Sequence, residues 1–124
     1  MQVVAVAEAT LKRWFVGLAA AGMPFLAALT PAQQASEGQV LYVKYCAACH
    51  GQKGTPTRSA LAQWPQLRPF SEPGFVQARS DDSIAAVTHS GVGKDMPARK
   101  DTLTREQMLA IARYVRSLGP PAVP

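Results

Sequence analysis

The clearest pattern of apolar and polar residues lies near the C-terminal end of the chain. One helix face there carries five apolar residues, Met108, Ile111, Ala112, Val115 and Leu118. Thr104 precedes this stripe as an N-cap residue, and Gln107 stands at the matching position of a capping box. Gly119-Pro120-Pro121 then ends the pattern. The sequence therefore predicts a helix between Thr104 and Gly119.

A second helix is predicted just before the two cysteines. Ser36 can cap it, and Glu37 suits the positive end of its dipole, so we expect it to run from Glu37 to about Ala47. Gly38 and Tyr42 are four residues apart and therefore share a helix face. Because glycine lowers helix stability, Gly38 is either a chance occurrence or the mark of a close helix–helix crossing.

A third helix is expected after Ser80, an N-cap residue that two aspartates follow. It would bury Ile84 and Val87 and run to about His89. The segments 51–79 and 91–97 are expected to be irregular loops because prolines and glycines interrupt them. No segment alternates between apolar and polar residues, so the sequence predicts an all-α fold with three main helices and long loops.

The N-terminal segment differs from the rest of the chain. Lys12 and Arg13 precede an apolar run from Trp14 to Leu29, which small and polar residues follow. This order is typical of a secretory signal peptide, and the run is shorter than the ~20 residues of a membrane-spanning helix. We therefore predict a signal peptide over residues 1–35 and a folded domain over 36–124. Cleavage after residue 32 and after residue 35 both remain open, and retention of the segment as a membrane anchor is the alternative.

Size and charge narrow the functional classes. A chain of 124 residues holds one small domain. The net charge of +5 comes from scattered basic residues, which is not the clustered pattern of a nucleic-acid-binding protein. It suits a protein that meets acidic partners through electrostatic attraction.

The stretch Cys46-Ala47-Ala48-Cys49-His50 is the strongest chemical signal in the chain. Two cysteines three positions apart, with a histidine directly after the second, are typical of a covalent c-type haem attachment site. Residues at this spacing lie on one face of a helical turn, so both sulfurs can reach one haem edge. The imidazole of His50 can then bind the iron.

Other uses of these cysteines fit less well. Two cysteines so close in a helical turn form a disulfide with difficulty and would constrain the chain very little. A thioredoxin-like pair calls for a βαβ pattern, which the sequence lacks. A zinc site needs about four ligands, whereas the whole chain has two cysteines and two histidines.

An iron held by His50 has a sixth position, which another side chain fills or which stays open. The candidate ligands are Met23, His89, Met96 and Met108. Met23 lies in the predicted leader, Met108 lies in the apolar stripe, where methionine usually serves packing, and a histidine at a helix end is explained by the dipole. Met96 stands in a glycine-rich loop before Pro97, which favours an extended backbone. We therefore predict Met96 as the second ligand, with His89 and an open site as alternatives.

With these residues in place, the chain resembles the small single-haem class I cytochromes c of bacteria. The resemblance covers about Ser36 to Leu118 and rests on the attachment site and on Lys94-Asp95-Met96-Pro97-Ala98, which looks like the family's methionine loop. The family also crosses its first and last helices. Gly38, Tyr42 and Tyr114 fit the crossing positions, with Tyr114 expected to stack offset on Tyr42.

The resemblance implies further roles at the site. The carbonyl of Pro65 would accept a hydrogen bond from the ring of His50, and Leu67 would lie on the haem. Arg58, Trp64 and Arg68 are the candidates for holding the haem propionates.

The resemblance also implies a function, which is electron transfer rather than catalysis. One haem c would be bound through Cys46 and Cys49, with His50 and Met96 as axial ligands, and a thioether ligand raises the reduction potential. The protein would work in the periplasm with a redox donor and acceptor that have acidic docking surfaces, without nucleic acid, and at a membrane only if its leader is retained. Lysines expected around the docking edge are Lys44, Lys53, Lys94 and Lys100.

Two alternative functions remain. The chain could be a permanently bound cytochrome subunit of a dehydrogenase or oxidase complex, or a haem sensor or peroxidase-like protein in which Met96 is displaceable.

Overall fold

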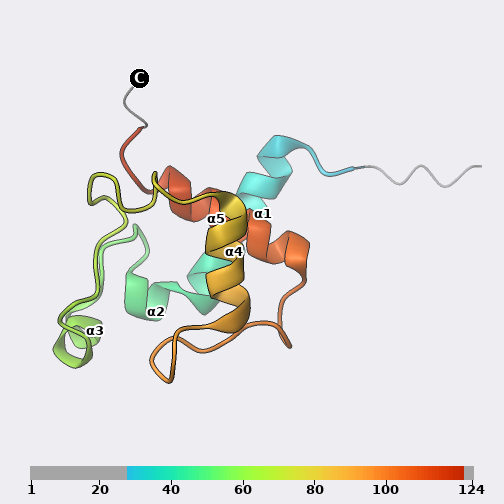
Figure 1. Ribbon diagram of the computed structural model, residues 1–124. Coiled ribbons are helices and arrows are strands. Elements are labelled where there is room, and N and C mark those ends of the chain that lie inside the picture. The colour runs from blue at the N-terminus through green and yellow to red at the C-terminus, as the bar shows by residue number, and fades with distance from the viewer. Residues whose placement is uncertain (1–27, 122–124) are drawn as a thin grey trace, which may run out of the picture.

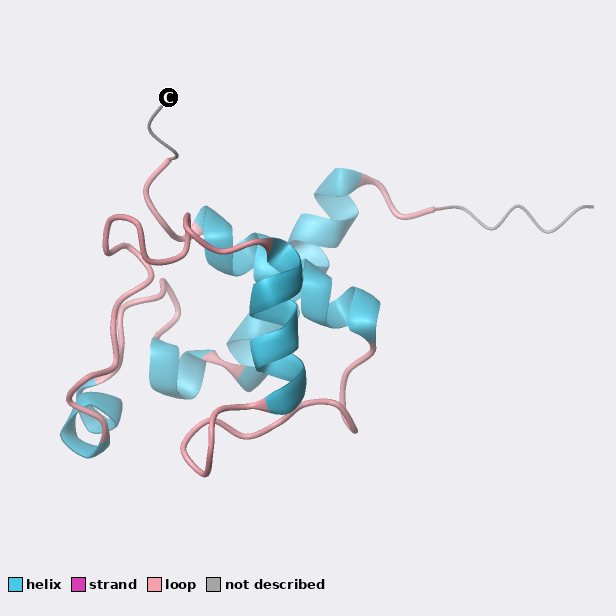
Figure 2. Ribbon diagram, viewed as in Figure 1, coloured by secondary structure: helices cyan, strands magenta, loops and turns pink. Residues whose placement is uncertain are grey.

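The computed structural model describes residues 28–121, in which the chain forms five helices. They are α1 (Pro31–Tyr45), α2 (Ala47–His50), α3 (Arg58–Gln63), α4 (Asp81–Ser90) and α5 (Arg105–Ser117). Within this range no segment forms a strand (Figure 2), and no helix is long and apolar enough to cross a membrane. The all-α prediction is confirmed, with α1, α4 and α5 as the three main helices.

The helices meet around α5, which crosses α1 and packs against α4 (Figure 1). α2 follows α1 after a short break and contacts it. The connection from α2 to α4, which contains α3, runs along the same side of the molecule as α2 (Figure 1). The first helix α1 and the last helix α5 therefore cross at the centre of the domain. The segment from α2 to the start of α4 lies on one side of this crossing (Figure 1).

Gly38 lies where α1 and α5 cross. A Cβ atom there would run into the carbonyl group of Ala110 and come within 3.2 Å of the Cβ of Tyr114, so glycine allows the two helices to approach closely. The ring centroids of Tyr42 and Tyr114 are 5.2 Å apart, with their planes inclined by 57°. The predicted close crossing is confirmed, but the expected offset stacking is wrong because the two rings are tilted against each other.

The apolar face of α5 forms much of the core, as its spacing predicted. Four of the five stripe residues, Met108, Ile111, Ala112 and Val115, are buried, and Leu118 packs half-buried against them. The capping box is also present. The Thr104 hydroxyl accepts from the N–H of Gln107, whose side chain accepts in return from the N–H of Thr104.

α4 faces the core with small residues. Its N-cap is Ser80, as predicted. Ile84 is half-buried, but Val87 is 42% exposed, so the expected burial of Val87 is wrong. Ala85 and Thr88 point inward instead, and these small side chains allow α4 to lie close to α5.

α1 begins earlier than the sequence suggested. Thr30 and not Ser36 is its N-cap, and Gln33 completes a capping box with Thr30. Ser36 lies inside the helix, where its hydroxyl donates to the carbonyl of Gln33. The predicted boundary between leader and domain, at residues 35 and 36, therefore falls within α1. Residues 1–27 of the predicted leader lie outside the described residues.

The segment 51–79, which was expected to be irregular, contains the short helix α3. The hydroxyl of its N-cap residue Thr57 accepts a hydrogen bond from the N–H of Ala60. A helix of six residues is too short to show a periodic stripe, and only Ala60 in it is buried. This explains why the apolar pattern did not reveal it.

Replacing Gly38 with alanine should destabilise the protein. Alanine gains up to ~1 kcal/mol of helix propensity, but its methyl group would overlap the backbone of Ala110, and overpacking costs about 1–3 kcal/mol. The midpoint of denaturant-induced unfolding, followed by circular dichroism, should therefore fall. Gln39→Ala, on the exposed face of the same helix, is the control and should leave the midpoint nearly unchanged. A higher midpoint for Gly38→Ala would contradict the close crossing.

Candidate haem-binding site

A break between α1 and α2 sets the directions of the two cysteines. Cys46 stands at the break with φ −122° and ψ −35°, outside the regular helical conformation. Its N–H still donates to the carbonyl of Tyr42 (2.8 Å), and its own carbonyl accepts from the N–H groups of Cys49 (3.2 Å) and His50 (3.0 Å). The turn is therefore closed by backbone hydrogen bonds. Both thiols are half-buried, and they are not joined in a disulfide.

The phenol of Tyr42 ties this turn to the core. Its hydroxyl donates to the carbonyl of Gly51, at 2.6 Å, directly after His50. The side chain is fully buried, and this burial raises the pKa of the Tyr42 hydroxyl far above its ordinary value. The hydroxyl thus stays protonated and keeps its role as a donor. Gly51 has φ +73°, and a Cβ there would run into the carbonyl of Thr55, so glycine suits this position.

The imidazole of His50 stacks on the ring of Phe70. The ring centroids are 4.9 Å apart and the planes are inclined by 20°. Phe70 is held in turn by a hydrogen bond from its N–H to the carbonyl of Gly54 (2.8 Å). Burial lowers the pKa of His50, which favours the neutral imidazole that metals bind. Its Nδ1 atom is buried without a hydrogen-bond partner among the described residues.

Met96 lies in a tight turn that begins at Val92. The N–H of Val92 donates to the carbonyl of Met96 (2.9 Å), and the N–H of Met96 donates back to the carbonyl of Val92 (3.2 Å). Gly91, at the C-terminal end of α4, has φ +68° and touches the backbone of residues 96–98 so closely that a Cβ would collide with it. The end of α4 therefore determines where Met96 lies.

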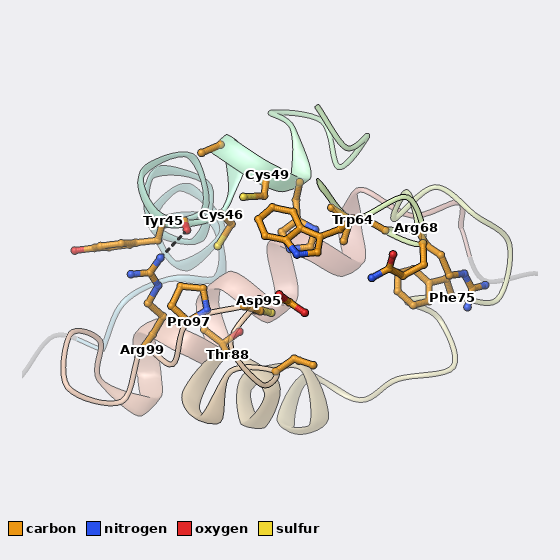
Figure 3. Close-up of a pocket in the computed structure, with 16 residues that line it drawn as sticks. Tyr45, Cys46, Cys49, Trp64, Arg68, Phe75, Thr88, Asp95, Pro97 and Arg99 are labelled. Carbon is orange, nitrogen blue, oxygen red and sulfur yellow. Dashed lines mark hydrogen bonds between the residues drawn. The ribbon is translucent and has the colours of Figure 1, made fainter. Parts of the chain in front are cut away.

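Cys46, Cys49, His50 and Met96 line one cavity of about 380 Å³. The α1–α2 turn forms one wall, the loop that carries Met96 and the end of α4 lie opposite, and the loop 64–75 forms a third side (Figure 3). The predicted site residues Cys46, Cys49, His50, Leu67 and Met96 all line it. Its volume falls within the ~300–1,000 Å³ of sites that take small molecules and cofactors.

Two arginines line the cavity, and one of them, Arg99, affects the pKa of Cys46. Burial raises the pKa of the Cys46 thiol to about 11, and the guanidinium of Arg99 opposes this rise. Arg68 also lines the cavity. Its guanidinium donates from Nε (2.8 Å) and Nη2 (2.5 Å) to the two carboxylate oxygens of Glu72. This ion pair is exposed, so it contributes little to stability.

Of the remaining predicted site residues, some line the cavity and others do not. Pro65 is exposed and does not line the cavity, and its expected hydrogen bond with His50 is not formed. Trp64 and Arg68, two of the three propionate candidates, line the cavity, whereas Arg58 on α3 does not. The four lysines expected near the docking edge, Lys44, Lys53, Lys94 and Lys100, are all exposed and lie outside the cavity lining.

Three site residues were not anticipated from the sequence. Phe70 orients His50, as described above. Phe75 lines the cavity, and its ring lies beneath two guanidinium groups, with Arg68 at 4.3 Å and Arg79 at 5.1 Å from its centroid. Arg99 reaches across to the carbonyl of Tyr45 (Figure 3). The only signal for the two phenylalanines was the presence of large aromatic residues in a loop rich in proline.

The donor set and the cavity together fit a covalently attached haem. Two thiols, a buried imidazole and a thioether line the same space, and apolar side chains make up much of the remaining wall. Among the described residues, the buried Nδ1 of His50 has no hydrogen-bond partner, so this nitrogen is not engaged by another protein group. This fold and this site define the class of c-type cytochromes.

Comparison with known proteins agrees with that class. The family described as "Cytochrome C oxidase, cbb3-type, subunit III" matches residues 33–115. The chain belongs to this family of c-type cytochromes. Membership implies a covalently bound haem c, and the positions of Cys46 and Cys49 are consistent with such an attachment.

Two solved structures are similar. The first is "KustC0563 c-type cytochrome", with a TM-score of 0.60 and 29% identity over 67% of this chain and 98% of that chain. The second is a point mutant of Kustc0563, with a TM-score of 0.59 and 28% identity over 66% of this chain and 98% of that chain. The resemblance stated from the sequence motifs is confirmed.

Gly91→Ala should loosen the turn that carries Met96. Gly91 and Gly93 both have positive φ, 68° and 52°, so alanine strains the backbone at either position by about 1–3 kcal/mol, and the ψ of −171° at Gly91 lies in a region that is almost restricted to glycine. Only at Gly91 would the methyl group also collide with neighbouring backbone, whereas nothing lies within 4 Å of a Cβ at Gly93. The urea midpoint should therefore fall further for Gly91→Ala than for the matched control Gly93→Ala. Equal midpoints would show that the contact at Gly91 is unimportant.

Proposed function

We propose that this protein is a periplasmic electron-transfer protein with one haem c, bound covalently through Cys46 and Cys49 and ligated by His50 and Met96. The observation that carries this proposal is that all four side chains line the same cavity, although Met96 comes from a loop far along the chain. The position of Leu67 in the lining supports its contact with the haem. Pro65 has no such support.

The residues of the chain would do three things for this function. A bound haem supplies an iron centre that gains and loses one electron. Phe70 restrains the ring of His50 by stacking, and the turn between Val92 and Met96 holds the thioether, which favours ferrous iron. The apolar wall formed by residues such as Leu67 and Phe75 disfavours the additional charge of ferric iron. If His50 and Met96 both bind the iron, no position on it would stay open for a substrate, which is the reason for proposing a carrier rather than an enzyme.

The proposed partners are a redox donor and a redox acceptor with acidic docking surfaces. The net charge of +5 and the exposure of Lys44, Lys53, Lys94 and Lys100 support this. The location in the periplasm rests on the predicted signal peptide. Fractionation of cells should place the haem-stained protein in the periplasm, whereas its recovery with membranes would indicate a retained leader.

A second candidate function is that of a cytochrome subunit in a larger oxidase complex. The observation that favours it is the family match, whose description names a subunit of a cbb3-type oxidase. Size-exclusion of the native material separates the two functions. A free carrier elutes at the size of one chain of about 13.2 kDa or less, whereas a subunit elutes together with its partners.

Met96→Ala should remove the weak sulfur-to-iron charge-transfer band in the far red of the oxidised protein. Met108→Ala is the matched control, because Met108 is 3% exposed in the core and does not line the cavity. It should keep the band and lose about 2–5 kcal/mol of stability, measured by denaturant unfolding. A band that survived Met96→Ala and vanished with Met108→Ala would reverse the ligand assignment.

Cys46→Ala and Cys49→Ala should each sharply lower the yield of covalent haem, because each removes one thioether bond. Haem staining of denaturing gels measures this yield. Met96→Ala serves as the control, since it removes a ligand but no covalent bond and should keep the stain. Full staining of both cysteine variants would mean that the motif does not attach haem.

A further inference from the structure

At the break between α1 and α2, the carbonyl group of Tyr45 accepts a hydrogen bond from the side chain of Arg99. The N–H of Cys46 donates to Tyr42, and the N–H groups of Cys49 and His50 both donate to Cys46. Among the described residues, no backbone N–H donates to the carbonyl of Tyr45, the last residue of α1. Nη2 of Arg99 donates to it instead, at 3.2 Å. A guanidinium at a helix C-terminus also suits the negative end of the helix dipole.

Arg99 approaches Tyr45 from a well-anchored backbone. Its N–H donates to the carbonyl of Thr88 in α4 (3.0 Å), and its carbonyl accepts from the N–H groups of Thr102 and Leu103, both at 2.9 Å. Its guanidinium carbon lies 5.3 Å from the centroid of the Tyr45 ring, within the range of a cation–π contact. One side chain therefore joins the end of α4 and the start of α5 to the end of α1.

The loop that Arg99 follows has backbone contacts at Gly91 and Val92 but few buried side chains. Val92, Lys94, Asp95, Pro97 and Ala98 are exposed, and Met96 is only half-buried. Segments with few buried apolar contacts open more easily than the core does. Arg99 is three residues after Met96. Among the described residues, its bond to Tyr45 is the one side-chain hydrogen bond that joins residues 91–99 to the α1–α2 turn.

We propose that Arg99 is a positioning residue that closes the methionine loop onto the end of α1, which keeps Met96 at its place in the site, and that its charge raises the reduction potential. The proposal rests on the proposed function, because it assumes that Met96 binds the iron. Arg99 and Cys46 both line the cavity, so the positive charge lies on the side where the haem would be attached. A guanidinium is always protonated, and a fixed cation there disfavours the additional positive charge of ferric iron.

Two variants separate the closing contact from the charge. Arg99→Gln removes both the charge and the planar fork of donors, whereas Arg99→Lys keeps the charge but not the fork. Arg113→Gln is the matched control, because Arg113 is exposed on α5 and outside the cavity lining. Each holoprotein is titrated with imidazole in its ferric form, with loss of the charge-transfer band as the signal, and its midpoint potential is measured.

Arg99→Gln should bind imidazole about tenfold more tightly than the parent, because imidazole captures the open loop and apparent affinity follows the open fraction. Its ferrous–ferric equilibrium should shift about tenfold toward ferric iron, the order of magnitude expected for one nearby charge in a partly screened site, which is ~59 mV for one electron. Arg99→Lys should bind imidazole more tightly than the parent but keep nearly the parent potential. Arg113→Gln should match the parent in both measurements.

The result that overturns the proposal is an Arg99→Gln protein that equals Arg113→Gln in imidazole affinity and potential. If Arg99→Gln yields no holoprotein, Arg99→Lys decides, and an imidazole affinity equal to that of the parent overturns the proposal. Failure of the proposed function looks different. The parent itself would then lack the charge-transfer band, and Met96 ligation and the role of Arg99 would fall together.

Discussion

The site depends on the close crossing of α1 and α5, which requires a residue without a side chain at position 38. Because α5 passes so near Gly38, Tyr42 one turn later is enclosed completely, and its hydroxyl donates inward to the carbonyl of Gly51. That hydrogen bond fixes the backbone directly after His50. The histidine is thus positioned from the core side by a helix crossing, and its ring is oriented from the loop side by Phe70.

The two main walls of the cavity differ in construction. The cysteine wall continues from α1 and is supported by buried residues such as Tyr42 and Ala47. The methionine wall is an exposed loop, and its shape comes from backbone contacts at Gly91 and from the pair of hydrogen bonds between Val92 and Met96. Electron transfer benefits from a site that changes little between its two charge states, so the lightly built wall is where additional restraint matters most.

Local signals predicted the parts of the molecule that local interactions determine. The capping box at Thr104, the stripe of α5 and the cap at Ser80 are short-range features, and they are present. Thr30 and Ser36 are both good cap residues, and the sequence alone does not show which one begins the helix. The apolar character of Val87 predicts an inward position, whereas the close approach of α4 to α5 favours the small residues Ala85 and Thr88 there. The hydrogen bond between Arg99 and Tyr45 joins residues 54 positions apart, so no local pattern announces it.

The hydrogen bond between the N–H of Phe70 and the carbonyl of Gly54 closes the intervening segment at its base. Both ends of that segment are fixed, and none of the residues of α3 within it lines the cavity. Loop-closure entropy rises by only about 0.6 kcal/mol for each doubling of loop length. Insertions and deletions within α3 can therefore accumulate during evolution without displacing His50, whereas its N-cap Thr57 donates to the carbonyls of Ala48 and Cys49 and has less freedom. The spacing between His50 and Gly54 has no such freedom, because any change there would move the histidine relative to the ring that orients it.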